Sequence, residues 1–158
     1  MMNGVTFEPA SLNDVLYVFL NARQYDKDEL KIQGVTEENI NHRIRLLSEV
    51  VCGKYNGIPV AIFGYVDLIR QLQFVFFATP AVNDFWKTAT KYARIYFQNR
   101  LDLHFPATGF VEVWEHHRES LVWLKRLGFR RDNKVIVQTS RGNLHWMTIT
   151  AQTARSPK

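Results

Sequence analysis

A short stretch near residue 115 holds side chains that can exchange protons near neutral pH. It reads Glu112-Val113-Trp114-Glu115-His116-His117, and Ser120 follows one helical turn later. Imidazole titrates close to pH 7, and a carboxylate beside an indole in a cleft can have a raised pKa. Glu112 and His117 are therefore candidate general bases, and the Ser120 hydroxyl can donate or accept a proton.

Each of these residues also has an ordinary explanation. Glu112 fits a strand carboxylate that faces solvent. The two adjacent histidines fit a polar turn, because neighbouring side chains seldom converge on one ligand. If the stretch is a strand, alternation places Glu112, Trp114 and His116 on one face and Glu115 and His117 on the other. The catalytic and the ordinary interpretations both stay open.

Cys52 is the single cysteine of the chain. No disulfide within the chain and no cysteine cage for zinc can form, and we expect no metal site. Its neighbours, Val50-Val51-Cys52-Gly53, indicate a strand interior. A buried cysteine usually behaves as a small apolar side chain, so core packing is predicted in preference to a nucleophilic role.

Charge is distributed unevenly between the two halves. Residues 1–80 contain seven Lys or Arg and nine Asp or Glu, whereas residues 81–158 contain thirteen and six, which gives the net charge of +5. A positive second half fits an anionic partner, such as nucleotide phosphates, nucleic acid or an acidic protein surface. An ordinary solvated basic face would give the same count.

Composition predicts one packed domain. The chain has 158 residues, of which 46% are hydrophobic and 13% aromatic. We expect a domain over residues 1–150 and a loose basic tail over 151–158. No apolar run is long enough to cross a bilayer, and the start lacks the pattern of a secretory signal. These features predict a cytoplasmic protein.

The first half predicts strands and two helices. A strand is expected at Val5–Glu8, then a helix with Ser11 as N-cap and Asp14 completing a near capping box. A second helix is expected from Thr36. The apolar stripes of these helices are Leu12, Val15, Leu16 and Phe19 in the first, and Ile40, Ile44 and Leu47 in the second.

Hairpins and helices alternate in the rest of the chain. Asn56-Gly57 predicts a tight turn between strands 49–55 and 58–66, because both positions favour positive φ. A third strand is expected at 71–78 and a long helix from Val82 to Phe97. The remaining predicted elements are a strand at 110–114, a short helix at 121–127 ended by Gly128, and a hairpin of strands 134–139 and 144–150. This order indicates an α/β (α+β) fold with a mixed sheet of about seven strands and helices on both faces.

The order of elements and the segment 115–129, with its Leu127-Gly128-Phe129 end, resemble the GNAT superfamily of acyl-CoA N-acyltransferases. The resemblance implies a fifth strand leading into a short helix and a final hairpin. A narrower resemblance is to GNAT-like internal virion proteins of short-tailed phages, which share the Trp-bearing strand and the Leu-x-x-x-Gly helix end. That likeness would place the protein in a host cytoplasm or a virion.

The resemblance also implies a cofactor site. The fourth and fifth strands would part to admit an acyl-CoA, and the acyl group would pass to an amine of unknown identity. Glu112 is the candidate base for the incoming amine, and His117 and Ser120 would lie beside the acyl group. The implied cofactor contacts are Phe76, Phe77, Ala78, Thr79, Asn83, Asp84, Lys87, His117 and Ser120.

Two departures weaken the implied activity. The turn at 79–84 has no glycine, Pro80 removes one backbone donor, and Asp84 adds a negative charge, although Lys87 and Lys91 partly compensate. Thr79-Pro80 also fits an ordinary helix start. Leu124 stands where many members of the superfamily have a tyrosine that protonates the leaving thiolate, and leucine has no proton to give.

Three functions are therefore compatible with the sequence. The first is acyl-CoA-dependent N-acyl transfer. The second is a catalytically degenerate scaffold that binds another protein, for example a host protein. The third is nucleic-acid binding through the basic half, which includes Arg126, Arg130, Arg131 and Lys134. Because no known nucleic-acid-binding motif accompanies these residues, we expect the third least.

Overall fold

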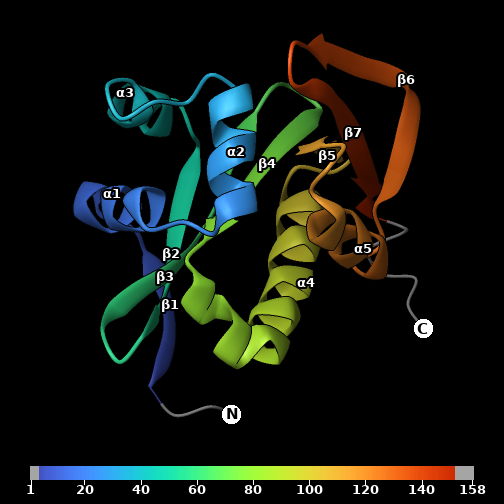
Figure 1. Ribbon diagram of the computed structural model, residues 1–158. Coiled ribbons are helices and arrows are strands. Elements are labelled where there is room, and N and C mark those ends of the chain that lie inside the picture. Colours follow the sequence, from blue (N-terminus) through green and yellow to red (C-terminus); the bar gives the residue numbers. More distant parts are fainter. Residues whose placement is uncertain (1–3, 152–158) are drawn as a thin grey trace. The chain divides into compact units, whose positions relative to one another are not determined.

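A computed structural model describes residues 4–151 of the chain (Figure 1). Its strands are β1 (Val5–Pro9), β2 (Glu49–Tyr55), β3 (Ile58–Asp67), β4 (Gln71–Ala78), β5 (Thr108–Trp114), β6 (Arg130–Thr139) and β7 (Gly142–Thr150). Its helices are α1 (Leu12–Leu20), α2 (Gln24–Ile32), α3 (Ile40–Arg45), the 3₁₀ segment η1 (Pro80–Phe85), α4 (Trp86–Leu103) and α5 (Arg118–Arg126).

The strands form a seven-stranded mixed sheet. Their order is β1-β2-β3-β4-β5-β7-β6. β1–β2, β2–β3, β5–β7 and β6–β7 pair antiparallel, whereas β4–β5 pair in parallel. This sheet confirms the predicted fold class.

The chain divides into two compact units. Unit 1 contains residues 1–66 and 75–89, and unit 2 contains residues 67–74 and 90–158. The boundary falls inside β4 and inside α4, so each of these elements contributes to both units. The prediction of a single domain over residues 1–150 stays a prediction.

In unit 1, helix α1 begins with the predicted capping box. The Ser11 Oγ accepts from the Asp14 N–H at 3.1 Å, and the Asp14 carboxylate accepts from the Ser11 N–H at 3.0 Å. The helix buries Val15 and Val18, while Leu12 of the predicted stripe is 41% exposed. The core around them contains Val15, Val18, Ile40, Cys52, Ile62 and Phe77.

The sequence pattern missed α2 and misplaced the next helix. In α2 the buried side chains are the carboxylates Asp26 and Glu29, so no apolar stripe marks the helix. Thr36 and Asn39 exchange side-chain bonds at 2.8 and 3.2 Å, and these bonds form a turn. α3 therefore begins at Ile40 and ends before Leu47.

Unit 2 packs two helices against each other. The Trp123 indole N–H on α5 donates to the Thr90 Oγ1 on α4 at 2.9 Å, and α4 and α5 lie side by side in Figure 1. Phe97 contacts both Phe74 and Phe129 edge-on, with ring centroids 4.8 and 5.2 Å apart. These contacts form an aromatic core under the first half of β4.

Several predicted boundaries differ from the structure. The long helix begins as the 3₁₀ segment η1 and continues in α4 past the expected end at Phe97. β6 starts at Arg130 rather than at 134. Ala151 is buried, with 4% of its surface exposed, and residues 152–158 of the predicted tail lie outside the described part of the chain. Within residues 4–151, no helix is long and apolar enough to cross a membrane.

The two turns on either side of β3 differ in how well their residues suit a left-handed backbone. Asn56 and Gly57 have φ of 51° and 80°, as predicted, between β2 and β3. The turn between β3 and β4 places Ile69 and Arg70 at φ of 63° each, and Leu68 N–H donates to the Gln71 carbonyl at 2.8 Å. A left-handed conformation costs a residue with a Cβ roughly 1–2 kcal/mol, and a β-branched residue suffers most.

Replacing Ile69 and Arg70 with Asn and Gly should therefore stabilise the fold. The double variant Ile69→Asn, Arg70→Gly should raise the free energy of unfolding by about 1–2 kcal/mol, because it removes the left-handed strain. Urea and thermal unfolding measure the change. The reciprocal change, Asn56→Ile with Gly57→Arg, should destabilise by a similar amount. If both variants have the same free energy of unfolding as the parent chain, the strain in this turn does not affect stability.

Candidate functional site

The parallel ladder between β4 and β5 is short. It joins Gln71, Leu72 and Gln73 to Thr108, Gly109 and Phe110. All of these residues belong to unit 2, whereas β4 continues as Val75–Ala78 in unit 1. The candidate residues therefore fall into two groups. One surrounds the end of β4 in unit 1, and the other follows β5 in unit 2.

The turn after β4 has the geometry of an ordinary helix start. Thr79 is extended, with φ −82° and ψ 164°, and Pro80 is the first residue of η1. The Thr79 N–H donates to the Val60 carbonyl at 2.8 Å, and the Val82 N–H donates to the Thr79 carbonyl at 3.1 Å. Because Pro80 has no N–H, the turn offers few backbone donors to a phosphate. Its predicted role in phosphate contact stays a prediction.

The predicted contacts in unit 1 differ in accessibility. Phe77 and Ala78 are 3% and 0% exposed, and Phe77 packs in the core of the unit. Asn83, Asp84 and Lys87 are exposed. The buried residues can therefore contact a ligand only through their backbone, whereas the exposed ones present their side chains. Among the exposed three, Lys87 alone carries a positive charge toward an anion.

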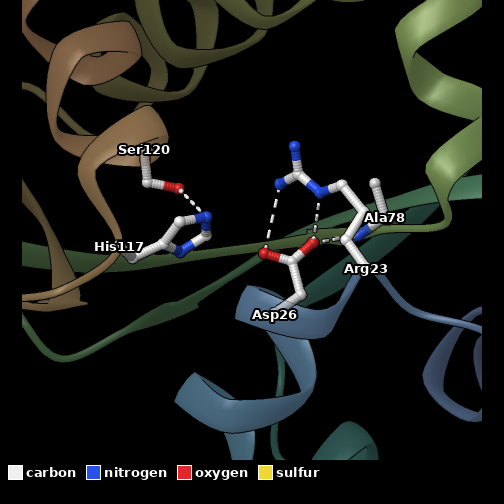
Figure 2. A network of polar contacts seen from close by, with 5 residues as sticks. All are labelled: Arg23, Asp26, Ala78, His117 and Ser120. Carbon is white, nitrogen blue, oxygen red and sulfur yellow. Dashed lines mark hydrogen bonds and ion pairs between the residues drawn. The ribbon is translucent and has the colours of Figure 1, made fainter.

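A buried polar network occupies the end of β4 (Figure 2). The Arg23 guanidinium donates twice to the Asp26 carboxylate, at 2.9 and 3.1 Å. The same carboxylate accepts from the Ala78 N–H at 2.9 Å, and the Arg23 N–H donates to the Ala78 carbonyl at 2.8 Å. The guanidinium also lies 5.9 Å from the Phe76 ring centroid and 5.8 Å from the Trp86 centroid.

This network bears on whether a CoA arm fits. Successive residues of a strand direct their backbone groups to opposite edges. The Thr79 N–H points to β3, so the backbone groups of Ala78 point to the other edge, where Asp26 and Arg23 already bind them. Phe76 directs its backbone to that same edge. Of the predicted backbone contacts, Phe76 fits a pantetheine arm better than Ala78 does.

Sequence reasoning did not single out Arg23 or Asp26. The available signal was their spacing of three residues, which suits an ion pair on one helical turn. Burial could not be inferred from that spacing, because such pairs are usually exposed. Asp26 is 1% exposed, and its two oxygens bind one side chain and one strand amide.

Removing the Asp26 carboxylate should cost much of the stability. Asp26→Ala leaves the Arg23 charge and the Ala78 N–H without this acceptor, so the free energy of unfolding should fall by roughly 3–5 kcal/mol. Asp28→Ala is a matched control, because Asp28 is only half-buried and accepts from the Gln24 side chain on the same helix. Its loss should stay below about 1 kcal/mol. Equal losses in urea unfolding would contradict a special role for Asp26.

In unit 2 the structure brings two predicted residues together. His117 is 1% exposed and occupies the N-cap position of α5, and its Nε2 lies 3.2 Å from the Ser120 Oγ (Figure 2). The His117 N–H donates to the Trp114 carbonyl at 2.9 Å, which fixes the backbone of the turn. The tautomer of His117 decides which partner donates in this pair. A proton can therefore pass between imidazole and hydroxyl without any side-chain movement.

Glu112 lies in a different group of contacts. It is half-buried and faces Trp146 across the β5–β7 ladder, and the indole Nε1 donates to its Oε2 at 3.4 Å. Trp146 stacks on Phe110 with ring centroids 3.8 Å apart. The described contacts thus place Glu112 beside an aromatic pair, while His117 contacts Ser120. Its predicted role as a base stays a prediction.

The remaining polar residues of this stretch have structural contacts. The Glu115 Oε2 accepts from the Asn143 N–H at 2.8 Å and lies 3.7 Å from the His116 Nε2. His116 is exposed and meets Trp114 edge-on at 5.0 Å. Glu115 therefore links the loop after β5 to the start of β7. This arrangement agrees with the polar-turn interpretation of His116.

The Leu-Gly-Phe end of α5 is a complete helix stop. Gly128 has φ of 104°, and its N–H donates to the Lys125 carbonyl at 3.1 Å, while the Phe129 N–H donates to the Leu124 carbonyl at 3.0 Å. This pattern is a Schellman motif, which requires a residue that tolerates positive φ. Leu124 is 3% exposed and packs in the core, so it takes no part in proton transfer.

Cys52 lies in the core of unit 1, as predicted. It is 0% exposed, and burial raises the pKa of its thiol to about 12. The nearby Asp14 carboxylate adds to the shift, and Lys54 opposes it. A thiol with such a pKa stays protonated at neutral pH and is a poor nucleophile.

The raised pKa of Cys52 should affect both the rate of its alkylation and the pH dependence of stability. Alkylation by iodoacetamide near neutral pH should be slow in the folded protein and fast in urea. The unfolded thiol ionises near its ordinary pKa of 9.0 and the folded one near 12, so the folded state binds more protons between these values. Stability from this group is present below pH 9 and is lost as pH rises toward 12. Rapid alkylation without unfolding would contradict this account.

The fold is shared with known acetyltransferases. It matches the ribosomal-protein-S18-alanine N-acetyltransferase from Escherichia coli with a TM-score of 0.67 at 12% identity, covering 93% of this chain and 94% of that one. Ard1 from Thermoplasma volcanium matches with a TM-score of 0.70 at 13% identity, covering 93% and 97%. A GNAT family acetyltransferase from Elizabethkingia anophelis with acetyl-CoA bound matches with a TM-score of 0.62 at 10% identity, covering 94% and 99%.

These likenesses extend over nearly all of each chain. No protein-family model matches the sequence, and no curated protein matches it either. At 10–13% identity, the structural matches establish the fold alone. The chain therefore has the fold of GNAT acetyltransferases, as the sequence resemblance implied.

Proposed function

We propose that this protein binds an acyl-CoA thioester and transfers its acyl group to an amine. The observation that carries the proposal is the shared fold, because one of the matching structures is an acetyltransferase with acetyl-CoA bound. The predicted residues that could move protons lie at the end of β5 and the start of α5 in unit 2. The amine acceptor remains undefined.

The residues of unit 2 can supply the proton transfers of such a reaction. A bound thioester would supply an acyl carbon that is activated toward amines. The new C–N bond forms as the C–S bond breaks, the amine loses a proton and the sulfur gains one. The hydrogen-bonded His117–Ser120 pair holds a proton that Ser120 can give to sulfur, and Glu112 can accept the proton of the amine.

The phosphate contacts should be weaker than those of a glycine-rich loop. Pro80 and the internal bond of Val82 reduce the number of amides that face outward, and Asp84 is exposed nearby. Lys87 offers one compensating charge. We therefore expect measurable but modest affinity for CoA, with most of the binding free energy from the pantetheine arm and the acyl group.

The alternative function is an interaction scaffold without catalysis. It is favoured by the bonds that already occupy the Ala78 backbone and by the core position of Leu124. In this alternative the partner is a protein, and a phage-encoded chain that acts on a host protein is one form of it. The structural matches give that phage origin no support.

Calorimetry with acetyl-CoA and a thiol-release assay with a panel of amines test the proposal together. Acetyl-CoA should bind with micromolar to millimolar affinity, and one or more amines should release free CoA. Ser120→Ala should lower the turnover rate by about a hundredfold, because it removes the proton donor, and should weaken the binding of acetyl-CoA far less.

Ser140→Ala is the matched control, because Ser140 is an exposed residue of the β6–β7 turn. It should change neither the rate nor the affinity. Absence of binding at millimolar acetyl-CoA would overturn the proposal and favour the scaffold. Binding with unchanged turnover in Ser120→Ala would retain acyl transfer but remove Ser120 from it.

A further inference from the structure

Unit 2 contains a pocket whose lining includes three positively charged residues. It has a volume of about 280 Å³ and lies where α5 ends and β6 begins. Its lining residues are Lys125, Gly128, Phe129, Arg130 and Arg131. No carboxylate belongs to this lining, so every charged residue of the lining is positive.

The cations of the pocket are not neutralised within the described chain. Over residues 4–151, Lys125, Arg130 and Arg131 are exposed and take part in none of the ion pairs. The nearest carboxylate in sequence is that of Asp132, which is half-buried and accepts from the Lys134 N–H at 2.8 Å. Like charges close to one hollow repel each other, and a bound anion would relieve that repulsion.

The backbone under these side chains is rigid. Gly128 and Phe129 are fixed by the Schellman motif, and Phe129 is 1% exposed. Arg130 and Arg131 pair with Thr148 and Met147 in the β6–β7 ladder. Rigid elements therefore present the cations, which lowers the entropic cost of holding a ligand.

The charge of Arg131 also acts on a buried neighbour. His145 precedes Met147 by two residues on β7, so its side chain lies on the same sheet face as Arg131. His145 is 8% exposed, and its Nδ1 has no hydrogen-bond partner among the described residues. Burial lowers the pKa of His145, the charge of Arg131 lowers it further, and Glu115 partly opposes them. The field of Arg131 thus extends into the unit.

Helix ends offer an ordinary explanation for only some of these charges. Lys125 lies in the last turn of α5, where cations favour the helix dipole, and Arg94 donates to the Arg126 carbonyl at 3.1 Å. Arg130 and Arg131 lie beyond the helix, on a strand. The dipole therefore does not account for them.

We propose that this pocket binds the phosphate group of a small molecule. Arginine pairs with phosphate through two parallel N–H donors, and lysine adds a point charge. The volume is close to the lower limit of ordinary ligand pockets, about 300 Å³, which suits a phosphate with a small organic body. The proposal is independent of acyl transfer, because no lining residue is a predicted catalytic residue or a predicted cofactor contact.

Amide chemical shifts of the full chain, titrated with inorganic phosphate at constant ionic strength, test the site. Shifts should saturate and should cluster at residues 125–131. Arg131→Gln should weaken phosphate binding about tenfold, and Arg131→Lys should restore part of the affinity. Arg45→Gln is the matched control, because Arg45 is an exposed cation of unit 1 and its loss changes the net charge equally.

Titrations with further ligands show whether an organic phosphate binds as well as inorganic phosphate. Glucose 6-phosphate should bind at least as tightly as inorganic phosphate, and glucose should not bind. If Arg131→Gln unfolds, Lys125→Gln replaces it. Shifts that grow linearly and spread over all basic residues would overturn the site, as would equal weakening in Arg45→Gln. Binding of single-stranded DNA without saturable phosphate binding would also overturn it, in favour of a nucleic-acid surface.

Discussion

The carboxylate of Asp26 is almost fully buried, and it binds both the Arg23 guanidinium and the Ala78 N–H. A buried charge is stable only with such partners, because desolvation otherwise costs several kcal/mol. The bonds attach the start of α2 to the last residue of β4. They also determine which backbone groups of β4 stay accessible along the edge that a CoA arm would need. The geometry of the candidate site in unit 1 therefore depends on this one ion pair.

The chemistry of unit 2 depends on a different local constraint. The Schellman motif ends α5 at a fixed point, and the bond from the His117 N–H to the Trp114 carbonyl fixes its beginning. Between these ends, the spacing of three residues places the Ser120 hydroxyl against the His117 imidazole. A short helix with two fixed ends thus holds the His117–Ser120 pair in one orientation. Leu124, on the same helix, is used for packing alone.

Local signals in the sequence were sufficient for much of the fold. Ser11 with Asp14, Asn56 with Gly57, and Gly128 each have a local physical effect that does not depend on distant residues. α2 could not be found in this way, because its buried side chains are Asp26 and Glu29. The turn at Ile69 and Arg70 contradicts local preference altogether. For the site, the spacing of His117 and Ser120 was informative. By contrast, Ala78 on β4, which Asp26 binds, lies 52 residues further along the chain.

The two outermost strands of the sheet are β1 and β6. β1 ends in Pro9, which lacks an amide proton, and the register of β6 is interrupted between Asp132 and Ile136, with Lys134 inside the interruption. A proline, a bulge and a charge each disfavour the docking of a foreign strand. The open margins of the sheet are thus poor templates for edge-to-edge aggregation, which should help the chain stay dispersed at high concentration.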